Sequence, residues 1–477
     1  IYETTYSSFV TLKPKTFYSK NYLEEIIGKA MEKKIETQFK ISVIIPTYNR
    51  SDILKRTLQA LSKQTLDPSF YEVIVIDDGS TDNSYYIVNN YSSKYNLKYI
   101  KQENTGPGAA RNKGIINASS ELILIINDDT ILAADNLERH LEAHSKYQNE
   151  KLSVLGTFDY IKQAQTRPFI YFVQQTSHIF AYNILEPEKR YNYRFFWTCN
   201  ISIKKQALID VGLFDENFKD PMMEDTEIGY RLQKMGYQVL FYPSAKSEHY
   251  DFTFNIDKYI KRQSMSGRNV VKFLIKHPEM FIIEKEIFGI SNLSDKTINI
   301  LKDNIQSLKN QYEIALKFFY EIDKLQIINP SFIPIGGNHH ITANELLNAM
   351  NKNISFIHYY NFYSGVIEEA NKIKNLENTS TEVVENNAKK QVQIKKSKPK
   401  ILFFMYGWNE GGGGTTYPRA VALKLAEMDY DISVLYAGLR HQKIETPYYL
   451  EETINNAVKL FGVFNRKYDF LITDNPL

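Results

Sequence analysis

Short apolar runs alternate with longer amphipathic segments in the first part of the chain. The apolar runs have the length of buried strands and cover residues 42–46, 72–76, 97–101 and 121–126. The segments between them have helical spacing over residues 52–63, 84–94 and 109–118. Strands and helices in this alternation indicate a parallel, doubly wound sheet, whose ligands bind beyond the carboxyl ends of the strands. The pattern predicts an α/β fold with a site at that edge.

Polar residues gather where each predicted strand ends. Residues 46–50 follow the first strand, residues 77–82 the second and residues 104–108 the third, while Asp128 and Asp129 follow the fourth. Because parallel strands end at one edge of a sheet, we expect these four segments to meet at a single crevice.

Asp128 and Asp129 end an apolar run that has the character of a buried strand. Two such carboxylates can hold a hard cation such as Mg²⁺ or Mn²⁺ and leave its other positions to water and a diphosphate. A cation there stabilises the charge on a departing nucleoside diphosphate. A turn or a helix cap is the alternative that these residues leave open.

Asp77 and Asp78 end the second strand, where a carboxylate can accept the imide N–H of a uracil or thymine ring and a ribose hydroxyl. A capped turn is the alternative role for this pair. Gly108 and Arg111 place a small residue and a guanidinium near the same edge. Close backbone approach and a cation suit a ligand that carries phosphate.

The pattern loosens after residue 158, and we expect an antiparallel half that faces the acceptor, with a helix over residues 225–235 and a strand over residues 238–241. Glu224 and Asp225 stand at the start of that helix. A carboxylate there either caps the free amides or, if it faces the crevice, removes a proton from an acceptor hydroxyl. The two acids therefore compete for the role of base.

His249 follows the predicted strand over residues 238–241 and can supply a neutral imidazole to the metal. A packing or hydrogen-bonding role is the alternative for a single histidine near a strand end.

Five segments in order resemble the motifs of family 2 glycosyltransferases with the GT-A fold. They read VIIPTYNR, VIDDGSTD, NTGPGAARN, NDD and ED, at residues 43–50, 75–82, 104–112, 127–129 and 224–225. The resemblance covers about residues 41–250. It implies a mixed Rossmann-like sheet with flanking helices, and an inverting transfer of a hexosyl or N-acetylhexosaminyl group from a nucleotide sugar.

The resemblance also implies roles for single residues. The turn that begins with Asp77 would contact the nucleoside, which points to Asp78, and the residues expected near the nucleotide sugar at the first strand are Pro46, Thr47, Tyr48 and Arg50. Gly108 and Arg111 would line the pocket for the donor phosphate or sugar.

The Asp-x-Asp position of the family falls on Asn127, Asp128 and Asp129, so its first member is Asn here. That departure shifts the metal duty to Asp129 and places Asp128, with Asn127, nearer the ribose or the donor sugar. The same resemblance implies Asp225 as the general base and His249 as a second metal ligand.

We expect five segments along the chain. These are an N-terminal extension over residues 1–40, the GT-A domain over residues 41–255, a helical extension over residues 256–374, a linker over residues 375–400 and a partial second Rossmann-like unit over residues 401–477. Helical periodicity in the extension is clearest over residues 308–325. Both ends of the sequence look cut, which predicts a piece of a larger protein.

The segment at residues 375–400 is polar and charged, so we expect it not to fold but to act as a tether. Its basic end, residues 395–400, can alternatively touch an anionic membrane surface. The adjacent His339 and His340 can bind a metal or form a solvated turn, and without a third ligand at suitable spacing we favour the turn.

The last unit resembles the opening of GT-B glycosyltransferases of family 4. Strands are expected over residues 401–404 and 432–436, with a loop of four glycines at residues 411–414 and a helix over residues 417–428 between them. The sequence stops before such a sheet is complete, so we expect this unit to be inactive by itself.

Composition narrows the setting. The chain has 477 residues, a net charge of +3 and one cysteine, Cys199, which excludes an internal disulfide. We expect a soluble cytoplasmic protein, with contact at the inner face of the membrane as the alternative. The small net charge does not indicate a nucleic-acid partner.

The sequence thus predicts a metal-dependent inverting glycosyltransferase that uses Mn²⁺ or Mg²⁺ and, in the first place, a UDP-sugar. The acceptor would be a hydroxyl of a bacterial surface glycan or glycoprotein. Two alternatives stay open: a nucleotidyltransferase, and a silent scaffold that binds a nucleotide sugar or a glycan. Oligomeric state, linkage and donor sugar are not specified by these residues.

Overall fold

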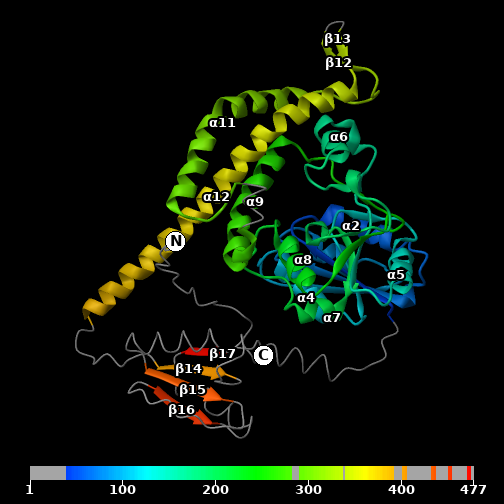
Figure 1. Ribbon diagram of the computed structural model, residues 1–477. Coiled ribbons are helices and arrows are strands. Elements are labelled where there is room, and N and C mark those ends of the chain that lie inside the picture. The colour runs from blue at the N-terminus through cyan, green and yellow to red at the C-terminus, as the bar shows by residue number, and fades with distance from the viewer. Residues whose placement is uncertain are drawn as a thin grey trace. The chain divides into compact units, whose positions relative to one another are not determined.

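The computed structural model describes residues 39–281, 289–336, 339–390, 400–405, 431–436, 449–453 and 470–473. The chain divides into two compact units, residues 1–377 and 378–477 (Figure 1). Residues 1–38 of the expected extension over residues 1–40, the four-glycine loop and the helix at residues 417–428 lie outside the described residues.

The first unit is built on one mixed sheet of eight strands, in the order β3-β2-β1-β4-β9-β6-β10-β8. Its first half is parallel and consists of β1 (Ile41–Thr47), β2 (Tyr71–Asp77), β3 (Asn96–Lys101) and β4 (Leu122–Ile126). Its second half consists of β9 (Asn200–Lys204), β6 (Leu152–Leu155), β10 (Gln238–Phe241) and β8 (Arg190–Tyr191). Because β9 runs antiparallel to both β4 and β6, the expected antiparallel half begins there.

Helices cover both faces of this sheet. Val43 and Ile45 of β1 pack in a core with α2 (Ser51–Leu61) and α5 (Asn136–Lys146). Ile44, between them, packs in a second core with α4 (Pro107–Asn117), α7 (Lys205–Asp210) and α8 (Glu224–Lys234). Neighbouring residues of a strand point to opposite faces, so a continuous apolar run is what a sheet covered on both sides requires. The predicted α/β fold with flanking helices is confirmed.

The predicted strands and helices of this half agree with the structure, apart from the length of one helix. The helix expected over residues 84–94 is α3 (Ser84–Asn89), which is shorter. The residues after Asn89 read NYSSK, and asparagine, serine and tyrosine are only moderate helix formers.

A small second sheet was not expected from the sequence. It has the order β5-β11-β7 and consists of β5 (Thr130–Leu132), β11 (Ser247–His249) and β7 (Asp159–Tyr160). His249 pairs with Thr130 across the β5–β11 contact, so the histidine lies beside the residues that follow β4.

The helical extension contains α9 (Ile256–Lys276), α11 (Asp295–Ile322) and α12 (Ala343–Lys390), with α6 (Pro168–Gln175) packed against it. Figure 1 shows α11 and α12 extending beyond the sheet domain to the hairpin β12 (Ile333–Gly336) and β13 (His339–Ile341). Gly267 and Gly365 lie where α9 and α12 meet. A Cβ on Gly267 would lie 2.0 Å from the carbonyl oxygen of Phe362, so the contact depends on glycine.

Two expectations for this part of the chain can be compared with the structure. We expected residues 375–400 not to fold, whereas α12 continues to Lys390. His339 and His340 are exposed, and no cluster of three metal-binding side chains occurs among the described residues. His340 stacks on Phe332 with ring centroids 4.4 Å apart.

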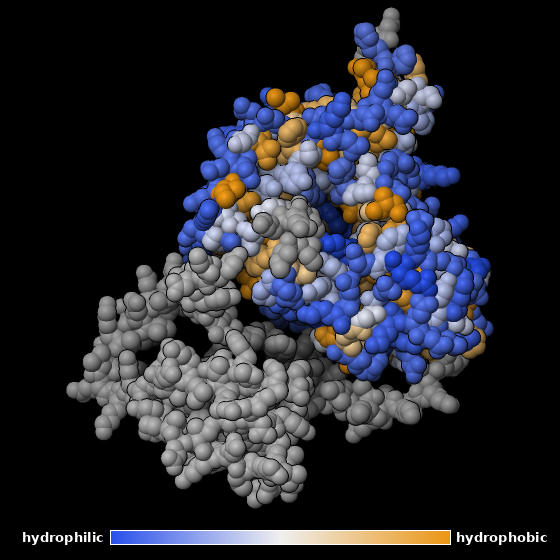
Figure 2. All heavy atoms as spheres, in the orientation of Figure 1, coloured by the Kyte–Doolittle hydropathy of each residue, from blue (hydrophilic) through white to orange (hydrophobic). Residues whose placement is uncertain are grey.

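Figure 2 shows hydrophilic side chains over most of the described surface on this face, with hydrophobic side chains in small separate patches. Within the parts of the chain that the structure describes, no helix is both long and apolar enough to cross a membrane.

The second unit contains a parallel sheet in the order β16-β15-β14-β17. Its strands are β14 (Lys400–Met405), β15 (Asp431–Tyr436), β16 (Tyr449–Thr453) and β17 (Phe470–Thr473). The first strand in sequence lies between the second and the fourth, as in a Rossmann-like sheet. The two strands expected in this unit are present and parallel to each other, while its likeness to GT-B enzymes stays a prediction.

Candidate functional site

Asp128 and Asp129 lie just beyond the end of β4, after Asn127, and are both buried. The side chain of Arg50, from the turn before α2, contacts both carboxylates. Its Nη1 lies 3.1 Å from Oδ1 of Asp128, and its Nη2 lies 2.8 Å from Oδ2 of Asp129. Thr47, at the end of β1, donates a hydrogen bond of 2.8 Å to Oδ2 of Asp128. The two predicted strand ends therefore meet as expected.

The two acids differ electrostatically. Burial raises the pKa of Asp128 well above the usual aspartate range, although Arg50 acts in the opposite direction. Burial also acts to raise the pKa of Asp129, but His249 and Arg50 outweigh it and hold that pKa well below its ordinary value. Asp129 is thus the carboxylate that stays ionised most firmly, as a cation ligand must.

His249 is held beside Asp129 by the small sheet. Its Nε2 lies 3.1 Å from Oδ2 of Asp129. The imidazole lies between two aromatic rings, with centroids 4.4 Å from Phe158 and 4.4 Å from Tyr160. Packing on both sides fixes the orientation of the ring, so the packing role and the ligand role that the sequence left as alternatives are compatible.

Asp129 and His249 suit a divalent cation as two of its ligands. Oδ1 of Asp129 and Nδ1 of His249 are buried without a hydrogen-bond partner, which is costly unless another group binds there. Carboxylate oxygen and imidazole nitrogen are ligands that Mn²⁺ accepts, and Mg²⁺ prefers oxygen. Among the described residues no third histidine, cysteine or acid completes a cluster, so water or a bound phosphate would have to supply the remaining ligands.

The acids at the end of β2 have their oxygens occupied by the protein. Asp77 accepts hydrogen bonds from the hydroxyl of Tyr99 and, at 2.6 Å, from the backbone N–H of Ser80. Asp78 accepts from Gln102 at 2.8 Å and from the backbone N–H groups of residues 105 and 106, each at 2.9 Å. The capped turn that the sequence left as an alternative is therefore present, and Asp78 also fixes the segment that leads into α4.

Arg111 of α4 and Glu224 of α8 form a buried ion pair. Nη1 of Arg111 lies 2.8 Å from Oε1 of Glu224, and both side chains are about 5% exposed. The guanidinium also lies over the ring of Phe214, with 5.5 Å to its centroid. Arg111 thus lies at the first turn of α8 and joins this helix to α4. The sequence predicted that it lines a pocket for the donor, whereas its side chain is buried between the two helices.

Asp225 is the next residue along α8 and is only partly buried. Its Oδ1 accepts a 2.7 Å hydrogen bond from the backbone N–H of Thr226. Burial and the Glu224 carboxylate raise the pKa of Asp225 above the usual aspartate range, while Arg111 acts to lower it. A carboxylate with a raised pKa is a stronger base, and it is not held in an ion pair as Glu224 is.

Cys199 is influenced by the charges of both Asp129 and Asp225. This buried thiol lies just before β9, and the backbone carbonyl of Cys199 accepts a 3.2 Å hydrogen bond from Thr130, next to Asp129. Burial raises the pKa of the thiol to about 12, and Asp225 and Asp129 both act on it in the same direction. Asp129 and Asp225 therefore both lie within electrostatic reach of the Cys199 side chain.

The remaining predicted residues lie around this edge. Tyr48 is 47% exposed, Pro46 and Asn127 are partly buried, and Gly108 is buried in the first turn of α4. The backbone N–H of Asn127 donates to Thr130 at 3.1 Å.

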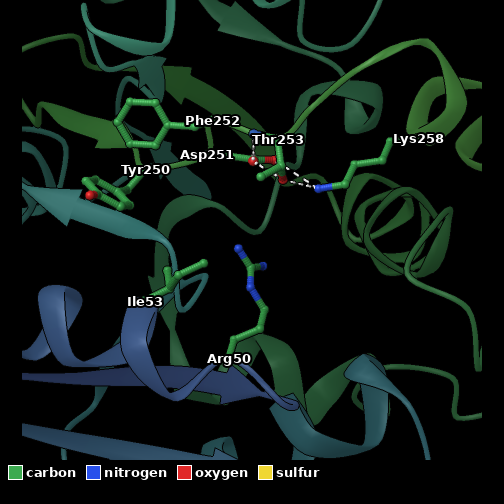
Figure 3. A pocket seen from close by; sticks show the side chains of 7 residues that line it. All are labelled: Arg50, Ile53, Tyr250, Asp251, Phe252, Thr253 and Lys258. Atoms are coloured by element: carbon green, nitrogen blue, oxygen red, sulfur yellow. Dashed lines mark hydrogen bonds and ion pairs between the residues drawn. The ribbon is translucent and has the colours of Figure 1, made fainter.

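A cavity of about 370 Å³ adjoins the acidic pair. Its lining residues come from the start of α2 and from the segment between β11 and α9, namely Arg50, Ile53, Tyr250, Asp251, Phe252, Thr253 and Lys258. Figure 3 shows the guanidinium of Arg50 pointing into this space, with Asp251 and Lys258 on the opposite side.

Sequence reasoning missed several of these groups. Thr57 of α2 donates a 2.6 Å hydrogen bond to the backbone carbonyl of Asp128, and Phe158 and Tyr160 enclose His249. Asp251 and Lys258 line the cavity. Phe158 and Tyr160 are far from His249 in sequence, so no local pattern predicts that they enclose it. Asp251, by contrast, lies only two residues after His249 and could have been considered from the sequence.

Residues 42–212 match the family model described as glycosyl transferase family 2. A validoxylamine A glucosyltransferase of Streptomyces hygroscopicus subsp. limoneus is 30% identical over 219 residues, which are 41% of this chain and 48% of that protein. A poly(ribitol-phosphate) beta-glucosyltransferase of Bacillus spizizenii is 38% identical over 114 residues, 23% of this chain and 18% of that protein. The chain spans about half the length of the first of these relatives.

A solved mannosyltransferase from Pyrobaculum calidifontis, in complex with GDP-Man and Mn²⁺, has 17% sequence identity to this chain. The superposition has a TM-score of 0.42 and covers 75% of this chain and 94% of the other.

Proposed function

We propose that the chain is a divalent-cation-dependent, inverting glycosyltransferase, because residues 42–212 match the family model described as glycosyl transferase family 2. It would move a hexosyl or N-acetylhexosaminyl group from a nucleotide sugar, a UDP-sugar first, to a hydroxyl of a bacterial surface glycan or glycoprotein. The observation that supports the proposal is the contact of Asp129 with His249, together with the partly buried Asp225, whose charge acts on the same thiol as that of Asp129.

In this proposal Asp225 is the base. Its carboxylate takes the proton of the acceptor hydroxyl while that oxygen forms a bond to the anomeric carbon of the donor. The bond between the anomeric carbon and the diphosphate oxygen breaks at the same time, and the nucleoside diphosphate leaves with the bonding electrons. The configuration at the anomeric carbon is inverted in the product. Glu224 does not take this role, because its Oε1 is held by Arg111.

Asp129 and His249 would hold the cation, and a bound cation supplies charge stabilisation to the departing diphosphate. Asp128 would lie nearer to the ribose or the donor sugar than to the cation, because Thr47 and Arg50 hold it at the end of β1. Asp77 and Asp78 shape the nucleoside side of the edge by fixing the turns after β2.

The proposal is tested by incubating the protein with a panel of UDP- and GDP-sugars, with Mn²⁺ or with a chelator, and measuring the nucleoside diphosphate released. Asp225→Asn should abolish turnover and keep nucleotide binding. Asp129→Ala should abolish turnover and also weaken nucleotide binding in the presence of Mn²⁺. Asp210→Asn, on the exposed end of α7, is the matched control and should leave both unchanged.

Two results would replace the proposal by its alternatives. Release of pyrophosphate would indicate a nucleotidyltransferase. Calorimetric binding of a nucleotide sugar without turnover, under every combination of cation and acceptor glycan tried, would indicate a scaffold. Near-normal turnover by Asp225→Asn would show that Asp225 is not the base.

A further inference from the structure

Arg50 takes the position of a cation between two buried acids. Its guanidinium spans Asp128 and Asp129, at 3.1 Å and 2.8 Å. Oδ2 of Asp129 contacts both Arg50 and His249, so the same oxygen lies against the guanidinium and against the second candidate metal ligand. A divalent cation bound to Asp129 and His249 would therefore lie next to a fixed positive charge.

Two like charges at such close range repel strongly in a partly buried site, where screening by water is weak. The carboxylates cannot satisfy both cations fully. Either Arg50 weakens cation binding, or its guanidinium leaves the carboxylates when the cation arrives.

The cavity beside Arg50 gives the side chain room to leave. The guanidinium points into this space of about 370 Å³ (Figure 3). Asp251 lies across the cavity. Its Oδ1 accepts from the backbone N–H of Thr253 at 2.6 Å and from the Thr253 hydroxyl at 2.7 Å, whereas its Oδ2 forms a long ion pair, 4.0 Å from Nζ of Lys258.

We propose that Arg50 is an internal counterion that the divalent cation displaces, and that Asp251 receives the displaced guanidinium. The inference rests on the cation site of the proposed function. It adds a positioning role for Arg50 and Asp251, because neither side chain needs to touch the cation or the reacting atoms.

The arrangement has a functional consequence for the edge of the sheet. With Arg50 in place, the guanidinium offsets part of the negative charge of the paired acids when no cation is bound. Once the cation binds, the guanidinium moves to the far side of the cavity, and the polar edge between β1 and β4 opens to the donor.

The test is a titration with Mn²⁺ alone, without nucleotide, followed by calorimetry or by the electron paramagnetic resonance signal of free Mn²⁺. If Arg50 occupies the carboxylates in about 90% of molecules or more, it lowers the apparent affinity about tenfold. Arg50→Gln should therefore bind Mn²⁺ about tenfold more tightly. Lys258→Gln removes the same charge from the same cavity and should change the affinity by less than about twofold.

Asp251 is tested in two backgrounds. In the otherwise unchanged protein, Asp251→Asn keeps the oxygen that accepts from Thr253 but removes the charge that receives Arg50, so Mn²⁺ binding should weaken about threefold. In the Arg50→Gln protein the same change should have no effect. An equal loss in both backgrounds would mean that Asp251 acts through its charge alone, and this would overturn the proposal.

Equal gains in Mn²⁺ affinity for Arg50→Gln and Lys258→Gln, or no gain in affinity for Arg50→Gln, would also overturn the inference. If Arg50→Gln does not fold, Arg50→Lys serves instead. A single ammonium cannot span both carboxylates, so a several-fold gain is expected and an unchanged affinity contradicts the inference. Absence of Mn²⁺ binding in every variant would overturn the inference as well.

The result is independent of sugar transfer. A protein that transfers no sugar under any condition but shows the expected Mn²⁺ affinities would overturn the proposed function alone. A protein that transfers sugar but binds Mn²⁺ equally with and without Arg50 would overturn this inference alone.

Discussion

Arg111 and Glu224 are 113 residues apart in sequence, yet Nη1 of the arginine lies 2.8 Å from Oε1 of the glutamate in a buried contact between α4 and α8. Nε of Arg111 and Oε2 of Glu224 are buried without a recorded partner. The pair is therefore incompletely satisfied, and each charge depends on the other for its neutralisation.

Removing one member of this pair should destabilise the protein strongly. We expect Glu224→Gln to cost about 3–5 kcal/mol in the free energy of unfolding, because the arginine charge stays buried without its partner. Urea unfolding measures this change. Replacing both residues together, as Arg111→Met with Glu224→Leu, should recover most of the loss.

The exposed pair of Arg139 and Glu142 is the matched control, with Nη1 2.7 Å from Oε2 and both side chains more than 40% exposed. Glu142→Gln should have a far smaller effect than Glu224→Gln. Equal effects from the two substitutions would show that burial is not what makes the inner pair costly to break.

Asp225 should set the acid side of the pH–rate profile. Burial and Glu224 raise its pKa, so the carboxylate is protonated at pH values where an ordinary aspartate is ionised. The base form is lost as pH falls through that raised pKa, and we expect turnover at saturating donor to fall with it, well above pH 4.

Arg111→Gln should shift the acid limb of the pH–rate profile to higher pH. The guanidinium acts to lower the pKa of Asp225, so its removal should move the limb to still higher pH. An unmoved limb in Arg111→Gln, with the fold intact by circular dichroism, would assign the limb to another group.

Two histidines of α5 should make the protein sensitive to mild acid. Burial lowers the pKa of His140 to about 3 and that of His144 to about 4, from an ordinary 6.5. Both rings contact the hydroxyl of Ser202, at 2.8 Å and 2.9 Å. Below pH 6.5 the unfolded chain binds protons at these rings and the folded chain does not, so stability falls with falling pH.

Between pH 7 and pH 5 each ring should contribute a loss of up to about 2 kcal/mol. The double variant His140→Gln with His144→Gln should lose correspondingly less over this range, as measured by urea unfolding at the two pH values. Asp128 and Asp225, with raised pKa values, act in the opposite direction in both proteins, so the difference between variants isolates the histidines. His340→Gln, on the exposed hairpin, should behave as the unchanged protein.

The contact of α9 with α12 should not tolerate a methyl group. Gly267→Ala would place a Cβ 2.0 Å from the carbonyl oxygen of Phe362, and backbone must move to relieve it. We expect a loss of about 1–3 kcal/mol in thermal or urea unfolding. Ser266→Ala, on the same helix, should change stability far less. A neutral Gly267→Ala would show that the two helices separate easily.

The first half of the sheet was predictable because its apolar runs are local signals. Each of β1, β2 and β4 is buried on both sides, so almost every residue is apolar and the following polar residues mark the strand end. Strand ends alone are therefore enough to place Asp128, Asp129 and Thr47 at one edge. The small sheet was missed because its strands have only two or three residues each.

Long-range contacts were the part that the sequence did not specify. Two contacts join segments about 90 residues or more apart: the ion pair of Arg111 with Glu224 and the stacking of Phe158 on His249. No periodic pattern in the sequence predicts either contact. Arg50 was expected near the donor, but its contact with the two acids depends on the angle at which the chain leaves β1. These contacts decide which acid is available, and they arise only when distant segments pack together.

Asp77 and Asp78 each have both carboxylate oxygens engaged by Tyr99, Ser80, Gln102 and the amides after residue 104. A ligand that arrives at this side of the molecule finds a surface already assembled, and little conformational entropy remains to be lost there on binding. Affinity at the turns after β2 would thus come from complementarity of shape, whereas the neighbouring Arg50, in the inference above, has to move when a cation binds.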